Sequence, residues 1–206
     1  MTIQRGRDWG GTGALSAEAP VVATDAELRA VVERARRDGG QNGRLPEVGV
    51  VGGDLCRTLG GLGDIDRLRG DVGTRVMLDV VRARLDGGDH WFAAHLVARQ
   101  ARWRGRFVVA MNAEWLAEWK AAPRAHPGDG LLDILDGSLS WRARLQARRR
   151  AHTGDHLPHP GLRTTRSASF ATSFERPVSV WLDGQRIGPF RTLELTVEGD
   201  ALPVVV

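Results

Sequence analysis

The residue pattern changes near residue 74, and this change limits the folds that the chain can adopt. Between 20 and 61, short apolar runs alternate with a segment of helical periodicity. From 74 onward, apolar and β-branched runs of strand length follow one another, separated by turns rich in Asp, Gly and Pro. The first pattern is typical of an open α/β sheet and the second of short strands. The sequence therefore predicts an α+β fold, with a truncated α/β nucleotide-type lobe over 1–70 and a β-rich, sandwich-like lobe with one helix over 71–206.

Residues 20–61 predict a strand, a helix, a second strand and the start of a second helix. Val21–Val22 indicates a short buried strand. Thr24 or Asp25 can cap the helix that follows, and apolar side chains recur along one of its faces until Gly39. The run "EVGVVGGDLC" then indicates a strand, a glycine turn and a helix start.

The rest of the chain predicts strands and one helix. The run "TRVMLDVVRARLDGGDHWFAAHLVARQ" predicts two strands around an Asp-Gly-Gly-Asp turn. Further single strands are indicated by "GRFVVAMNAEWL" and "LLDILDG", and "SLSWRARLQARRRAH" indicates a basic amphipathic helix capped by Ser138 or Ser140. Four more short strands are expected in "GLRTTRSASFAT", "VSVWLDGQRIG", "TLELTVEG" and "ALPVVV".

Composition indicates a soluble protein of the cytoplasm that can still contact a membrane surface. The hydrophobic fraction is 42% and the charged fraction is 26%, which are ordinary values for a globular protein. No apolar run approaches the roughly 20 residues of a membrane span, and the N-terminus lacks the apolar core of a signal peptide. Cys56 is the single cysteine, so no intramolecular disulfide can form. The pattern leaves the oligomeric state open, a homodimer included.

Two short motifs allow either a functional or a structural interpretation. The turn Gly52-Gly53-Asp54 lies between a predicted strand and a predicted helix, where backbone amides can surround a phosphate. A glycine turn in this place is also common as a purely structural feature. Asp183 lies in "VWLDGQRIG", where its carboxylate could reach a cleft between the lobes. Asp-Gly is also the usual hairpin dipeptide, and in that role Asp183 should tolerate replacement by Asn.

Two charged or metal-binding patterns are weaker. His152, His156 and His159 have a spacing that metal ligands use, but prolines and a glycine interrupt the segment. The arginine-rich run 142–150 could bind nucleic acid or anionic lipid, although a solvated helix face is the more common explanation. Nucleic-acid binding is disfavoured because the run has no interleaved aromatic residues and no known reading motif.

The stretch "HPGDGLLDIL", residues 126–135, places a proline and two glycines around Asp129 directly before a predicted strand. A turn that only reverses the chain can use any mixture of these residues, closed by hydrogen bonds from local amides to Asp129. A turn that holds a cation needs a carboxylate and backbone carbonyls. The sequence alone allows both.

Taken in order, these segments resemble the catalytic domain of the diacylglycerol kinase family, which includes bacterial lipid kinases and is related to sphingosine and NAD kinases. The run "VVAMNAEWLAEWKAAPRAHPGDGLLDIL" is similar to a family strand that ends in Asn, followed by a "DDGLLDV" turn and strand. The stretch around "VSVWLDGQRIG" resembles the closing strands with their "DGE" hairpin, and "GGDLCRTLGG" resembles the end of "GTGNDFARTLG". The resemblance covers about 48–206 and implies ATP-dependent phosphoryl transfer to a lipid hydroxyl.

The resemblance also implies roles for individual residues. Asp183 matches the general base of the "DGE" motif, which deprotonates the lipid hydroxyl. Asp54, with Gly52 and Gly53, matches the "GTGND" nucleotide motif, and Asp25 matches the Asp of the "GGDGT" motif. The implied cofactor is Mg²⁺, both with ATP and at a structural site.

The structural magnesium site falls on the turn quoted above. The resemblance implies that the Asp129 side chain binds the ion, assisted by the backbone carbonyls of His126 and Leu131. The implied partners are a lipid alcohol or a membrane surface.

The motifs depart from the family pattern at the nucleotide side. Both glycines that flank Asp25 are replaced, "GTGND" is shortened to "GGD", and Gln185 stands in place of the second acid of "DGE". The first strand and helix of the nucleotide lobe, with their phosphate-contacting loop, have no counterpart. Two functions therefore follow: an ATP-dependent lipid kinase, or a catalytically inactive relative that binds a lipid or a partner protein through the β-rich lobe.

Overall fold

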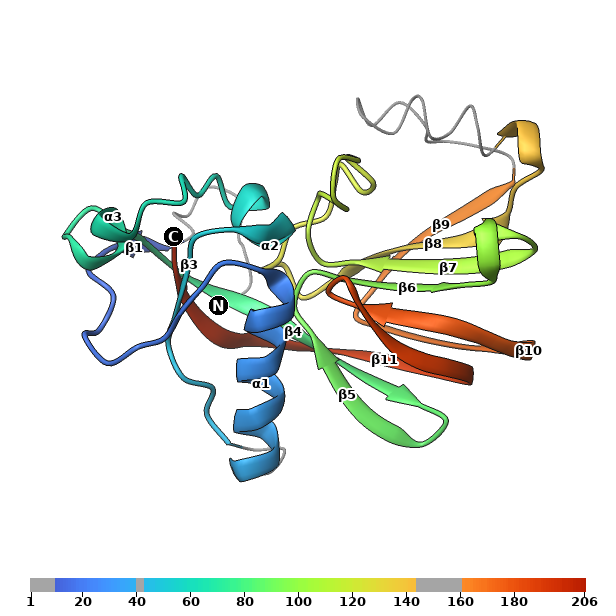
Figure 1. Ribbon diagram of the computed structural model, residues 1–206, viewed down its shortest axis with the longest axis horizontal. Coiled ribbons are helices and arrows are strands. Elements are labelled where there is room, and N and C mark those ends of the chain that lie inside the picture. The colour runs from blue at the N-terminus through green and yellow to red at the C-terminus, as the bar shows by residue number, and fades with distance from the viewer. Residues whose placement is uncertain (1–9, 40–42, 144–160) are drawn as a thin grey trace.

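The strands of the computed structural model, which describes residues 10–39, 43–143 and 161–206, form one curled, mostly antiparallel sheet (Figure 1). Along its main path the strand order is β1-β4-β11-β10-β6-β7-β8-β9, while β2 and β3 extend it beside the end of β11 and β5 pairs with β4. The strands are β1 Gly11–Thr12, β2 Val21–Val22, β3 Val48–Val50, β4 Thr74–Leu85, β5 Gly88–Phe92, β6 His95–Arg99, β7 Arg106–Met111, β8 Leu132–Ser138, β9 Leu162–Ser167, β10 Ser169–Leu182 and β11 Gln185–Val205. The helices are α1 Asp25–Gly39, α2 Gly53–Thr58, α3 Ile65–Arg69 and the 3-10 helix η1 Ala101–Trp103.

The fold is α+β, as the sequence predicts, with more strand than helix among the described residues. The order β2, α1, β3, α2 matches the order predicted for residues 20–61. Thr24 is the residue that caps α1, because its Oγ1 accepts the N–H of Glu27 at 3.2 Å. Asp25, the other candidate cap, directs its carboxylate elsewhere.

The final strand joins the two parts of the chain. The end of β11 runs parallel to β3, with Val204 opposite Val48, and β3 runs parallel to β2. The same hydrophobic cluster contains buried residues from α1, β3, β4 and β11, among them Leu28, Leu78 and Val204. The predicted boundary at residue 70 falls between α3 and β4, but residues on both sides of it share this core.

Two strand predictions need correction. The second strand expected before residue 100 is two strands, β5 and β6, because the chain leaves the ladder at Ala93 and Ala94, whose N–H groups bond to a side chain instead. The four short strands expected after residue 160 are three, because the single strand β11 passes through the last turn signals with an irregularity between Glu198 and Leu202.

The predicted basic helix lies mostly outside the described residues. Its described part shows a helical turn at 141–143, where Ser140 Oγ accepts the N–H of Ala143 at 3.3 Å. None of the described helices combines the length and the apolar character needed to span a membrane.

Asp79, which the sequence analysis did not single out, joins three segments through one buried carboxylate. It is 1% exposed. Its Oδ1 accepts the N–H of Asp200 at 3.0 Å and its Oδ2 accepts the N–H of Gly130 at 2.6 Å, while its own N–H donates to the Pro127 carbonyl at 2.7 Å. The carboxylate therefore ties β4 to the irregular part of β11 and to the turn before β8. Burial raises the pKa of Asp79 from 3.8 to about 6.

This raised pKa gives a testable pH dependence. Between pH 3.8 and about 6 the folded state holds a proton that the unfolded state has released, so the free energy of unfolding should fall as the pH rises through this window. Asp79→Asn should reduce the slope, and Asp38→Asn, at an exposed position near the end of α1, should leave it unchanged. Urea unfolding across the window measures both. Equal slopes in wild type and Asp79→Asn would contradict the assignment.

Candidate active site

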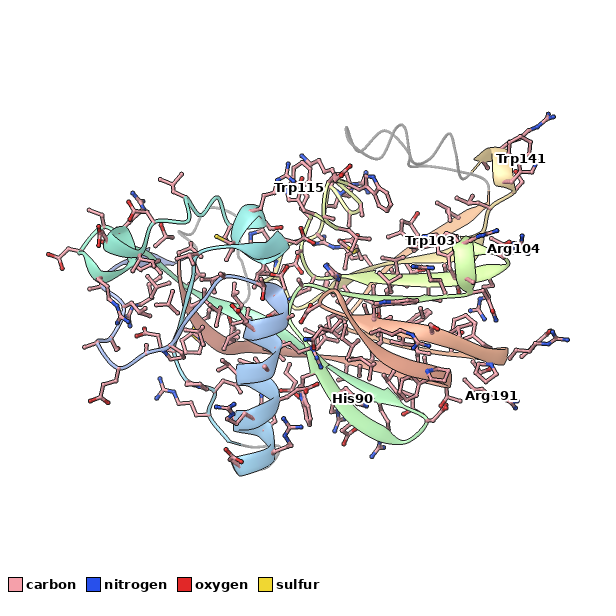
Figure 2. The ribbon with its side chains drawn as sticks, viewed as in Figure 1. His90, Trp103, Arg104, Trp115, Trp141 and Arg191 are labelled. Atoms are coloured by element: carbon pink, nitrogen blue, oxygen red, sulfur yellow. The ribbon has the colours of Figure 1, made fainter. Side chains whose placement is uncertain are left out.

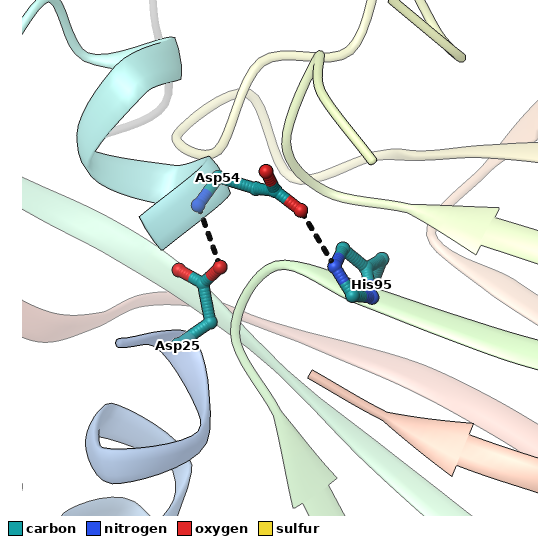
Figure 3. A group of neighbouring side chains, drawn as sticks. All are labelled: Asp25, Asp54 and His95. Carbon is teal, nitrogen blue, oxygen red and sulfur yellow. Dashed lines mark hydrogen bonds and ion pairs between the residues drawn. The ribbon is translucent and has the colours of Figure 1, made fainter. Parts of the chain in front are cut away.

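Three ionisable side chains from separate segments meet where α1, α2 and β6 come together (Figure 3), and a fourth lies near them in the β10–β11 turn. Asp25 is the first residue of α1, Asp54 lies in the first turn of α2 and His95 begins β6. Asp183 completes the group from the turn between β10 and β11, close enough for its charge to affect Asp25 and His95. The structure thus brings together three of the four aspartates that the sequence singles out, all except Asp129. It adds His95, which the sequence does not single out.

Asp25 binds the beginning of α2 rather than its own helix. Its Oδ2 accepts the N–H of Asp54 at 2.6 Å and its Oδ1 accepts the N–H of Leu55 at 3.1 Å. The first N–H groups of a helix have no partner within the helix, and a carboxylate there is also favoured by the helix dipole. Asp25 therefore occupies the position that a bound anion would need at the start of α2.

Gly52 and Gly53 are explained by the close approach of the loop before α1. A Cβ at Gly52 would lie 2.3 Å from the carbonyl oxygen of Ala23, and a Cβ at Gly53 would lie 2.6 Å from Oδ1 of Asp25. Gly53 also has a φ of +92°, which side-chain-bearing residues rarely adopt. The glycines thus make room for residues 23–25 of the protein itself.

Asp54 and His95 form an ion pair next to these glycines. The atoms Asp54 Oδ2 and His95 Nε2 are 3.0 Å apart, and Oδ2 also accepts the N–H of Ala117 at 2.8 Å. Burial is the largest influence and opposes charge on both residues, but the hydrogen bonds and the neighbouring opposite charges together outweigh it, lowering the pKa of Asp54 and raising that of His95. The loop carrying Ala117 is held against α2 by the Arg57 guanidinium, whose carbon lies 3.4 Å from the Trp115 ring centroid.

Asp183 is enclosed by backbone. It is 3% exposed, and its carboxylate accepts three successive N–H groups, from Ala93 at 2.9 Å, Ala94 at 2.9 Å and His95 at 3.0 Å. Its own N–H donates to the His95 carbonyl at 2.9 Å. The residue does lie in an Asp-Gly turn, with φ of 47° at Asp183 and 81° at Gly184, as the sequence predicts. Its carboxylate, however, points into the protein and not toward solvent.

The burial of these acids affects their protonation. Burial, together with the charge of Asp183, raises the pKa of Asp25 to about 6. Burial also raises the pKa of Asp183, against the opposing charge of His95 and the three backbone hydrogen bonds. Three carboxyl groups thus lie around the imidazole of His95, and shifted pKa values of this kind are frequent in functional sites.

The polar side chains next to this group also have hydrogen-bond partners within the protein. Gln185, which stands where the family motif has Glu, accepts a hydrogen bond from Arg29 on α1. Arg29 is itself only 7% exposed and donates to Glu33 at 2.7 Å. The side chain that replaces the second acid is therefore bound to a cation of the nucleotide-side helix.

A divalent cation fits the donor chemistry of part of this site. Asp25, Asp54 and His95 offer ligand atoms that lie within 4.8 Å of one another, and carboxylate and imidazole donors suit such ions. Binding there would replace the hydrogen bond between Asp54 and His95.

The predicted magnesium turn lies apart from this group and is arranged differently. Asp129 Oδ1 accepts the N–H of Leu131 at 3.0 Å, and its Oδ2 accepts a hydrogen bond from Arg166 on β9. The His126 carbonyl accepts the N–H of Asp129 at 3.4 Å. The local amide bond is the one expected for a turn without an ion. His152, His156 and His159 lie outside the described residues.

One feature of the sequence indicates that His95 is buried and needs a polar partner. In "WFAAHLVA" it is the single polar residue of an apolar run, and a buried polar group needs a partner. Its partner could not be found, because Asp54 is 41 residues away along the chain.

Comparison with known proteins supports the fold class. No protein-family model matches the chain, and no curated protein matches it. Two solved structures of a "putative diacylglycerol kinase" from Bacillus anthracis str. Sterne are similar, with TM-scores of 0.64 and 0.67 at 14% and 12% sequence identity. The matches cover 89% and 90% of this chain, and 75% and 76% of those chains.

A third structure, of a diacylglycerol kinase from the same organism, has a TM-score of 0.55 at 16% identity and covers 78% of this chain and 66% of that chain. The protein therefore shares the fold of these three structures. At these identities the likeness concerns the fold.

The contacts of Asp183 predict that replacing it is costly even without any catalytic role. In Asp183→Asn one carboxylate oxygen becomes an NH₂ group that faces backbone N–H donors, so we expect a loss of about 2–4 kcal/mol in the free energy of unfolding. The Asp-Gly turn alone predicts instead that Asn is tolerated at this position.

The matched control is Asp86→Asn, in the exposed Asp-Gly turn between β4 and β5, where φ is 46°. Its carboxylate also accepts backbone N–H groups, from Arg191 and Thr192, but these contacts are exposed. The variant should therefore lose clearly less stability in the same urea titration, because water can replace them. Equal losses at the two turns would show that the buried amide contacts are not the cause.

Proposed function

We propose that this chain is a lipid-kinase-like protein that binds a lipid surface without transferring phosphate. The observation that carries the proposal is the enclosure of Asp183. A general base must come within about 2.6–3.2 Å of the hydroxyl that it activates. The carboxylate of Asp183 is 3% exposed and already accepts three backbone N–H groups. The residue that matches the family's base therefore acts here as a hydrogen-bond acceptor for the backbone of Ala93–His95.

The phosphate side of the site supports the same proposal. Anions bind at helix starts through free N–H groups, but Asp25 already accepts those of Asp54 and Leu55. Glycines allow a phosphate to approach the backbone, but the space at Gly52 and Gly53 is taken by residues 23–25. A nucleotide would have to displace a carboxylate from these amides, which makes binding weak.

The lipid side is supported by the end of β8. Trp141 is 64% exposed and points away from the sheet (Figure 2). The guanidinium carbon of Arg142, also exposed, lies 5.3 Å from its ring centroid. Tryptophan and arginine are the side chains that favour the interface of an anionic membrane. Arg142 is also the first residue of the arginine-rich run 142–150 of the sequence, and Trp141 directly precedes it.

An active lipid kinase is the second candidate, and one observation favours it. Asp25, Asp54 and Asp183 match three acidic positions of the kinase motifs and converge in one group with His95. In this case Asp25 and Asp54 would hold a divalent cation, which would neutralise charge on the phosphates of ATP. Asp183 would accept the proton of the lipid hydroxyl after release of its backbone contacts.

A phosphate-transfer assay separates the two candidates. With labelled ATP, Mg²⁺ and a broad lipid extract, wild type should transfer no label above the rate without protein. Transfer by wild type that Asp54→Asn reduces by about a hundredfold or more would establish the kinase and contradict the proposal. Asp66→Asn, in the exposed first turn of α3, is the control for unspecific effects of removing a carboxylate.

Sedimentation with lipid vesicles tests the binding half of the proposal. Wild type should bind phosphatidylglycerol-containing vesicles and not pure phosphatidylcholine vesicles. Trp141→Ser should weaken binding by roughly tenfold, because the indole no longer enters the interface. The control is Leu62→Ser, which also removes an exposed large apolar side chain, here 75% exposed, and should have little effect. Absence of binding to anionic vesicles, or an equal effect of both substitutions, would contradict the proposed surface.

A further inference from the structure

The turn at 126–131 contains the kind of oxygen atoms that bind a cation, and a cationic side chain is already there. We infer that the guanidinium of Arg166 holds this corner in place of the divalent ion that the family resemblance implies. The inference concerns the architecture of the β-rich part and is independent of whether the protein transfers phosphate.

The contacts of Arg166 reproduce the donor set of a metal ion. One terminal nitrogen donates to the carboxylate of Asp129 and lies 3.4 Å from the carbonyl oxygen of Arg124. The Nε atom lies 3.6 Å from Oδ2 of Asp133. Two carboxylates and one carbonyl are the oxygen ligands that Mg²⁺ or Ca²⁺ prefers, and the planar guanidinium can bind the same groups through several N–H donors.

The remaining atoms of the turn do not fit the expected magnesium site. That site needs free oxygens on Asp129 and on the carbonyls of His126 and Leu131. Here both carboxylate oxygens of Asp129 accept hydrogen bonds, from the Leu131 N–H and from Arg166, and the His126 carbonyl accepts the N–H of Asp129. A divalent ion bound to Asp129 would also lie against the positive charge of Arg166. The family's structural metal and this arginine therefore exclude each other.

The carboxylates depend on a nearby cation because they are largely enclosed. The side chains of Asp129 and Asp133 are only 15% and 14% exposed. Burial raises the pKa of both, and the charge of Arg166 opposes this rise. Removing the arginine would leave two neighbouring acids with only the weaker charges of His126 and Arg124 to compensate them, and this is the arrangement that attracts a divalent ion.

The position of Arg166 also links the turn to an edge strand. Arg166 lies on β9, directly opposite Asp133 of β8 in the antiparallel ladder. A metal ion could order the turn alone, whereas the guanidinium can do so only when β9 is paired. The corner and the edge strand are therefore stabilised together.

Thermal unfolding with and without Mg²⁺ tests the inference. At matched ionic strength, millimolar Mg²⁺ and EDTA should leave the melting temperature of wild type unchanged. Arg166→Ala should lower it by roughly 2–4 °C, and Mg²⁺ should restore part of the loss. Adding Asp129→Asn to Arg166→Ala should abolish that recovery. Arg163→Ala, exposed on the same strand, is the matched control and should melt close to wild type without a response to Mg²⁺.

Arg166→Lys keeps a cation and guards against a failure of the alanine variant to fold. It should melt between wild type and Arg166→Ala and should not respond to Mg²⁺. The inference is overturned if Mg²⁺ stabilises wild type through Asp129, if Arg166→Ala melts like Arg163→Ala, or if a folded Arg166→Ala gains nothing from Mg²⁺. If the alanine variant does not fold, a Mg²⁺ response of Arg166→Lys equally overturns it.

Discussion

The carboxylate of Asp183 accepts three successive backbone N–H groups at the point where β5 ends and β6 begins. These contacts let the chain leave one ladder at Ala93 and Ala94 and enter another at His95 without unpaired buried amides. The switch places β5 beside β4 and β6 beside β10, so both halves of the curled sheet depend on it. It also fixes the backbone of His95 and thereby its ion pair with Asp54. One buried acid thus organises both the sheet and the candidate site.

Local features of the sequence are sufficient for much of the fold. Apolar runs and turn residues predict β2, α1, β3 and α2 in the correct order, and Asp-Gly signals locate the turns after β4 and β10. The errors have a common physical cause. The break at Ala93 and Ala94 leaves no local trace, because alanine fits a strand and the group that interrupts pairing is about 90 residues away. Likewise β11 continues through "EGDALP", where local residues indicate a turn, because pairing with β4 resumes beyond it.

The sequence predicts which residues form the candidate site better than it predicts the chemistry of the site. The resemblance to lipid kinases singles out Asp25, Asp54 and Asp183, and the fold brings them together. What the sequence cannot give is which atoms surround each carboxylate. Glycines at 52 and 53 suggest access for phosphate, but whether the space is free depends on how closely residues 23–25 approach. The acid at 129 suggests an ion, but the cation opposite it is set by the register of β8 and β9.

The 21-residue strand β11 has a consequence for how the protein forms. Its first half pairs with β10 and its second half, from Leu193 to Val205, pairs with β4. Its last residues are the only link that the described ladders provide between β3 and the rest of the sheet. Val48 pairs with Val204, which is synthesised more than 150 residues later. Strand β3 therefore cannot join the main sheet until the end of β11 has left the ribosome. Contacts between residues that are far apart in the sequence slow folding, and strand edges stay exposed until these contacts form. We expect a nascent chain whose early segments stay open to chaperones and proteases until the end of β11 has been synthesised.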